Sequence, residues 1–185
     1  MLFRSAIIAS EIVWRFTTTA GAAGDSTANT TVGTFLGKYA ATSAWAGGGT
    51  NDLFADITGA QNAASQVDYA GLAILNNNTA NTAQNAVAYI SSEVAGGASI
   101  AIGADTTAAS AKGSATAQLV TIASSTTAPA GVSFSSPTTA GTGISLGNIP
   151  VANVKGLWVR RTAANTSALS GDGVTLAVQV DTGSL

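Results

Sequence analysis

The 185-residue chain contains no cysteine and no histidine. Without cysteine there is no disulfide framework, no thiolate nucleophile and no sulfur ligand for a metal. Without histidine the chain lacks the usual general base near neutral pH, the commonest metal ligand and the base of a serine triad. We therefore predict a protein that is not an enzyme and has no cofactor and no metal site.

Charge is also scarce. Only 9% of the residues are charged, against roughly 25% in an ordinary soluble domain, while the hydrophobic share of 46% is normal. Alanine, glycine, threonine, serine and asparagine take the place of charged residues, which leaves a monomer poorly protected against self-association. Small neutral side chains suit a surface that neighbouring subunits cover, because they lose little entropy on burial. The alternative explanation is a genome rich in G and C, which enriches these residues without selection for packing.

Two classes of partner are disfavoured by the same composition. Seven Lys and Arg residues are scattered along a chain of net charge −2, so the basic stripe that nucleic acid requires is missing. No apolar run approaches the roughly 18 residues of a membrane span. We expect neither nucleic acid nor a membrane as partner. Residues 1–8 carry one arginine and a short apolar run, but Glu11 and Arg15 interrupt the next apolar residues, and the signal-peptide pattern is weak.

Short segments rich in β-branched and aromatic residues alternate with clusters of small and turn-forming residues, which is typical of antiparallel strands. The expected fold is an all-β antiparallel β-sandwich, either jelly-roll or immunoglobulin-like. Residues 1–16 are expected to form an N-terminal arm or first strand, and residues 17–185 a single sandwich domain. The strands are predicted at residues 7–16, 67–75, 85–91, 99–104, 117–122, 132–134, 143–146, 154–161 and 174–180.

Three finer predictions concern local structure. Residues 35–39 and Trp45 are expected in an irregular stretch, and residues 52–57 in a short helical turn capped by Asn51 or Asp52. Residues 174–180 alternate strictly with period two, which predicts a half-buried strand. The turn residues 170–173 predict that this strand forms a long-looped hairpin with residues 154–161.

The nine carboxylates do not define a site. A glycosidase needs two of them on either side of a sugar, and nothing in their spacing demands such a pair. Asp52 and Asp56 lie four residues apart, but the alternating oxygen ligands of a calcium loop are missing. No glycine-rich segment matches a phosphate loop. We predict no small-molecule substrate.

One segment, Trp158-Val159-Arg160-Arg161, has a distinctive character. Tryptophan and arginine are enriched at interface hot spots, so Trp158, Arg160 and Arg161 are the candidate interface residues. The alternative is a core tryptophan followed by two arginines with exposed heads. For Trp158 we favour the core, because a buried tryptophan contributes a large apolar area. For the two arginines both interpretations stay open.

The succession of short motifs resembles a family of small virion structural proteins of tailed bacteriophages. The motifs, in order, are 36–39 (LGKY), 51–59 (NDLFADITG), 67–69 (VDY), 102–103 (IG), 128–134 (APAGVSF), 146–150 (LGNIP), 157–162 (LWVRRT) and 173–180 (GVTLAVQV). The resemblance covers most of the chain from about residue 17 onward, and residues 1–16 fit less well. It implies a non-catalytic subunit of the phage particle, assembled in the cytoplasm of the host bacterium.

The resemblance does not specify a position on the particle. The first hypothesis is an accessory subunit that decorates the capsid or forms a collar at the neck. Its partners would be further copies of itself, in a trimer or ring, and other head or neck proteins. The second hypothesis is a tail-fibre or receptor-binding module.

Overall fold

The computed structural model describes residues 6–167, 169 and 171–182. In this part of the chain, strands dominate and helices are confined to a few short turns. The strands are β1 (Ile12–Thr18), β2 (Gly37–Ala44), β3 (Val67–Asn76), β4 (Ala83–Glu93), β5 (Ser99–Ala104), β6 (Ser110–Ala111), β7 (Leu119–Thr121), β8 (Ile144–Ile149), β9 (Asn153–Thr162) and β10 (Val174–Thr182). The helical elements are the α-helix α1 (Gly59–Ala63) and the 3-10 helices η1 (Ala9–Glu11) and η2 (Ala140–Thr142).

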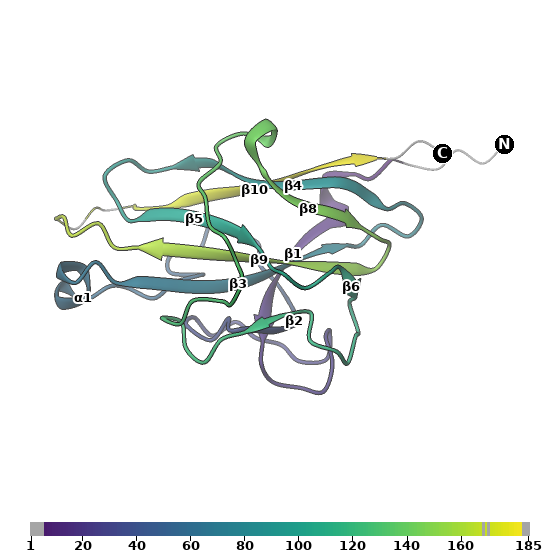
Figure 1. Cartoon of the computed structure of the whole chain (residues 1–185), viewed down its shortest axis with the longest axis horizontal. Coiled ribbons are helices and arrows are strands. Elements are labelled where there is room, and N and C mark those ends of the chain that lie inside the picture. Colours follow the sequence, from purple (N-terminus) through teal and green to yellow (C-terminus); the bar gives the residue numbers. More distant parts are fainter. Residues whose placement is uncertain (1–5, 168, 170, 183–185) are drawn as a thin grey trace.

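The strands form two sheets in which the paired strands are antiparallel. The large sheet has the order β5-β9-β3-β1-β2-β7, with the short β6 also paired to β9, and the small sheet has the order β10-β4-β8. Figure 1 shows β10, β4 and β8 above β9 and β3, with α1 at the end where β3 begins. The expected all-β antiparallel β-sandwich is confirmed.

The main core lies between the two sheets, and strand alternation explains which residues enter it. On β3, Leu72 and Ile74 face the small sheet and are fully buried. Ala73 and Leu75 point to the opposite face and are equally buried in a second, smaller core. Because both faces of β3 are covered, its residues 70–75 are continuously apolar rather than alternating.

The second core exists because the large sheet curls. Ala40 of β2 and Leu119 of β7 pack against Val154 and Leu75 on the outer face of β9 and β3. The approach is close: a Cβ at Gly156 would lie 2.5 Å from Leu119 Cγ. Glycine at this position therefore allows the β7 segment to lie directly on β9.

Several predicted strands are confirmed. Residues 99–104 coincide with β5, and residues 67–75, 85–91, 154–161 and 174–180 lie within β3, β4, β9 and β10. On β10, Val174, Leu176, Val178 and Val180 are half-buried against the main core. The prediction of a half-buried strand there is therefore confirmed. Residues 117–122 and 143–146 overlap β7 and β8 in part, and residues 7–16 contain η1 before β1 begins.

Other local predictions were wrong. Of the stretch expected to be irregular, residues 37–39 belong to the strand β2, because pairing with β1 and β7 orders them, while residues 35 and 36 and Trp45 lie outside any strand. The short helix is α1, capped by the Thr58 hydroxyl, and residues 52–57 are not helical. Residues 132–134 form no strand, although Ser135 makes an isolated bridge to Ile102.

The predicted hairpin between residues 154–161 and 174–180 was also wrong. Strand β9 pairs with β3 and β5 in the large sheet, whereas β10 pairs with β4 in the small sheet. The segment between them therefore crosses from one layer to the other, and Ser170 of the predicted turn lies outside the described residues. Strand β1 runs through the boundary expected at residue 16, between β2 and β3 in the large sheet. Among the described residues, no helix has the length and apolarity needed to cross a lipid bilayer.

Candidate functional site

Trp158, the first predicted interface residue, lies in the interior. Its side chain has no exposed surface, and its Nε1 donates a hydrogen bond of 2.7 Å to Asp105 Oδ2. The ring lies over two glycines, one in β2 and one in β3. It is 3.0 Å from the position that a Cβ would take at Gly37 and 3.3 Å from that at Gly71. The core interpretation of Trp158 is confirmed. Because its side chain has no exposed surface, it cannot contact a partner of the folded subunit.

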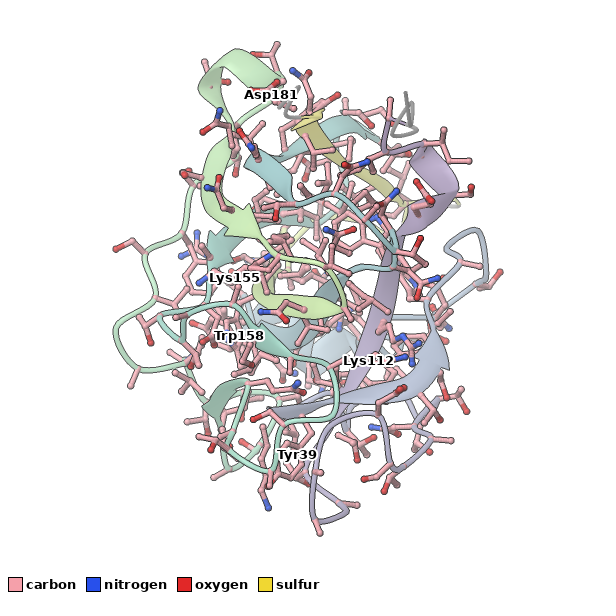
Figure 2. The ribbon with its side chains drawn as sticks, turned by 90° about the vertical axis from the view of Figure 1, so that its right-hand side faces the viewer. Tyr39, Lys112, Lys155, Trp158 and Asp181 are labelled. Carbon is pink, nitrogen blue, oxygen red and sulfur yellow. The ribbon has the colours of Figure 1, made fainter. Side chains whose placement is uncertain are left out.

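Asp105 joins this tryptophan to a buried polar cluster. Its Oδ2 also accepts from the backbone N–H of Val120 (2.9 Å), and its Oδ1 accepts from the N–H of Thr107 (2.7 Å). Lys155 Nζ donates 2.6 Å hydrogen bonds to the carbonyl oxygens of Asp105 and Thr107. Figure 2 shows Lys155 and Trp158 close together in the middle of the molecule. The cluster fastens the segment after β5 and the strand β7 to β9.

Burial lowers the pKa of Lys155 from its ordinary value of 10.5, and the charge of Asp105 opposes this change in part. A buried amine with a lowered pKa is a common catalytic group. Here its Nζ is bound to two carbonyl oxygens, and neither of the two surface hollows described below is lined by Lys155. The geometry therefore assigns the cluster a structural role. The sequence did not reveal it, because Asp105 and Lys155 are 50 residues apart and share no motif.

Arg160 and Arg161 point to opposite faces of the large sheet. The Arg160 guanidinium lies 5.2 Å from the centroid of the Phe134 ring. The Arg161 guanidinium lies 4.7 Å from the centroid of Phe54 and donates 2.8 Å hydrogen bonds to Asp68 Oδ2 and to the Ala55 carbonyl oxygen. Only 15% of the Arg161 side chain is exposed. Both arginines hold loops of their own chain against β9, which leaves little of Arg161 for a partner.

The carboxylates likewise form hydrogen bonds within the chain. Each of the nine accepts at least one hydrogen bond from the chain itself. Their partners are, in order: Glu11 with Asn78; Asp25 with Arg15, and with Lys112 as an ion pair; Asp52 with Trp45; Asp56 with Asn51; Asp68 with Gln66 and Arg161; Glu93 with the N–H of Ile100; Asp105 with Trp158; Asp172 with the N–H of Ala98; and Asp181 with Asn85. Within the described residues, no three acidic side chains gather as a metal site would require.

The surface has two hollows of note. The smaller, about 130 Å³, lies beside Phe54, Tyr69 and Arg161. The larger, about 270 Å³, is apolar and open, and it separates residues 7–14 from β10. We call it the β10 groove; its lining includes Ile7, Ile8, Ile12, Trp14, Val178 and Val180.

The β10 groove is the candidate functional site. Ile8, on its N-terminal side, is 58% exposed and adds to the apolar surface of the groove. The wall on this side is held by Glu11, whose Oε2 accepts from the N–H of Ile8 and from Asn78 Nδ2 at 2.9 Å each. These two hydrogen bonds lower the pKa of Glu11. An apolar groove beside a sheet edge is suited to contact with another polypeptide rather than to catalysis.

Comparison of the chain with protein-family models, with curated proteins and with solved structures finds no match. Fold and site therefore define only a general class of protein. It is an antiparallel β-sandwich whose described charged side chains contact their own chain, with an apolar groove at one sheet edge.

Proposed function

We propose that this protein is a non-enzymatic structural subunit of a tailed-bacteriophage particle. Its place would be on the capsid as a decoration protein or at the neck as part of a collar, after assembly in the cytoplasm of the host bacterium. The observation that carries a structural role is the use of all nine carboxylates, the main candidates for acid–base chemistry in a chain without histidine and cysteine, to tie its own loops and strands together. The phage context is supported by the resemblance of the sequence motifs.

Self-association and contact with other head or neck proteins follow from the character of the surface. The nine carboxylates accept hydrogen bonds from the chain itself. The β10 groove exposes aliphatic side chains. Such a surface favours contacts through apolar and hydroxyl groups. The expected assembly is a trimer or a ring of identical subunits, as closed symmetry at a capsid or neck position requires.

A tail-fibre or receptor-binding module is the second candidate. The smaller hollow favours it, because Phe54, Tyr69 and Arg161 there combine aromatic and polar groups in the way that many ligand sites do. Against it, Arg161 and Asp68 are already bound to each other at 2.8 Å.

The test is to locate the subunit in purified particles of the phage that encodes it. Imaging of intact particles, with and without an affinity label fused to this chain, would show its position, and quantitative mass spectrometry its copy number. Decoration implies on the order of hundreds of copies, and a neck or tail position about six to twelve, because each location imposes its own symmetry. A chain that is absent from washed particles would contradict the proposal, and label at the tip of the tail would favour the receptor-binding alternative.

A further inference from the structure

Strand β10 is the one long sheet edge that remains open in the described part of the chain. The outer side of β5 is covered by residues 135 and 136, through Ile102 with Ser135 and the Ser136 hydroxyl with Ile100. The edge strand β7 has only three residues. The edge strand β8 is interrupted by Gly147, at φ 71°, and ends before Pro150. Three of the four sheet edges are thus short, bent or covered, which is how natural sheets prevent unwanted pairing.

The edge of β10 has none of these protections. The strand is nine residues long and contains no proline, glycine or lysine. The two register shifts in its pairing with β4 arise because β4 has the extra residues, while β10 itself stays regular. Its only charge is Asp181, near its end. A regular, nearly neutral edge is a template for another strand.

We propose that the partner is the β10 strand of a second copy of this chain, paired antiparallel about a two-fold axis. The inference deepens the self-association in the proposed function and rests on it in that respect. A two-fold pair adds to a trimer or ring the contact that joins two such rings in dihedral symmetry. The two small sheets would then join into one six-stranded sheet, with the order β8-β4-β10-β10-β4-β8. The β10 groove of each subunit lies beside this junction.

The position of the charge favours the antiparallel arrangement. In a parallel pair the two Asp181 side chains would lie side by side and repel each other. In an antiparallel pair centred on Val178 they are separated by six residues, about 20 Å along the strand. Each Asp181 then lies opposite Thr175 of the partner subunit, whose hydroxyl can donate to it.

The hydrogen-bonding pattern of β10 gives the same register. The Gly173 carbonyl oxygen accepts from Val94 of the segment after β4. Amide groups alternate in direction along a regular strand, so those of Thr175, Ala177 and Gln179 also turn toward β4, and those of the intervening residues turn outward. Centring the pair on Val178 places two outward-facing amides opposite each other, as an antiparallel ladder requires. Ala177 then lies opposite Gln179 of the partner subunit, in a non-hydrogen-bonded pair.

The chain has no cysteine, so a single introduced cysteine is a specific probe of this register. The Cα atoms of a non-hydrogen-bonded antiparallel pair are about 4.5 Å apart, within the range that a disulfide spans. We expect an equimolar mixture of Ala177→Cys and Gln179→Cys chains to form a covalent dimer under mild oxidation. Either variant alone should cross-link at least about tenfold less, since its two cysteines would be diagonal neighbours roughly 8 Å apart. Ser145→Cys, exposed on the edge strand β8, is the matched control and should not cross-link.

A second measurement does not depend on disulfide chemistry. In the full-length chain, Ala177→Lys/Gln179→Lys places lysines opposite each other in the proposed pair, and light scattering should show at least a tenfold rise in the dimer dissociation constant. Ser145→Lys, the control, should leave that constant unchanged. Self-association without selective 177–179 cross-linking, an unaltered dimer of the double lysine variant, or a wild-type monomer at all concentrations would each overturn the β10 pairing. If the β10 dimer forms in solution but the protein is absent from phage particles, the β10 pairing is supported and the proposed function is contradicted.

Discussion

At the scale of single residues, the structure is organised around a few buried polar groups. Asp105 is the clearest example, because one carboxylate accepts from Trp158, Val120 and Thr107 and so connects three segments of the chain. Removing such an acceptor leaves buried donors unsatisfied, which costs more than the hydrogen bonds themselves contribute. The stability of the second core should therefore depend strongly on this one side chain.

We predict that Asp105→Ala lowers the free energy of unfolding by about 3–5 kcal/mol, because the Trp158 indole and the Val120 amide lose their acceptor in a buried site. Urea unfolding followed by tryptophan fluorescence measures the change. Asp56→Ala removes an exposed carboxylate that accepts from Asn51, and should cost less than about 1 kcal/mol. Equal losses in the two variants would contradict the role assigned to Asp105.

Lys155 gives a prediction about pH. Its folded pKa is below 10.5 because of burial, whereas in the unfolded chain it titrates near 10.5. Between these two values the unfolded state binds more protons, so the contribution of Lys155 to stability rises with pH through that window. The free energy of unfolding of the wild type relative to Lys155→Met should accordingly increase as the pH rises from neutrality toward 10.5. Other titrating groups are common to both chains and cancel, and a difference independent of pH would show that the amine is not perturbed.

At the scale of elements, strands buried on one face and on two faces have different sequence signatures. Strand β10 is covered on one face and shows strict alternation, whereas β3 is covered on both and shows none. The predicted pairing partners were less reliable than the strands themselves. Register and neighbours depend on which layers the connecting segments cross, and short-range patterns carry little of that information.

The alternation on β10 predicts unequal effects of the same substitution at adjacent residues. Val178 packs against the main core, so Val178→Asp should lower the free energy of unfolding by about 2–4 kcal/mol through burial of an unpaired carboxylate. Gln179 is exposed on the other face, and Gln179→Asp should change stability by no more than about 0.5 kcal/mol. Thermal or urea unfolding at low protein concentration, where pairing between subunits does not contribute, measures both. Two variants that melt together would mean that the faces of β10 are assigned wrongly.

At the scale of the whole molecule, the scarcity of charge has a consequence for attachment. The charged residues in the described part of the chain contact that same chain, so we expect an interface to be built mainly from apolar and hydroxyl groups. Burial of apolar area is not screened by salt, whereas exposed ion pairs are.

If the protein is the proposed subunit of a phage particle, we therefore predict that it stays on particles washed in 1 M NaCl, where the Debye length falls to about 3 Å. Electrophoresis of the pelleted particles and of the supernatant, before and after the wash, measures the retained fraction. A wash at low salt is the control for mechanical loss. Quantitative release at high salt, with a monomer by light scattering, would indicate an electrostatic attachment.

The sequence by itself determined the fold class, most of the strands and the half-buried alternation of β10. These features follow from local alternation and turn residues, which act over a few positions. It also indicated the burial of Trp158, because a large apolar ring in a strand contributes most when it is covered.

Only the tertiary structure decided the rest. That Asp105, Val120 and Trp158 meet depends on the curl of the large sheet, and that β2 is a strand depends on its partners β1 and β7. The placement of β9 and β10 in different layers decided that they are not a hairpin and left the outer edge of β10 open. Such features arise from contacts between residues far apart in the chain, whose free energy is gained only when the layers pack together.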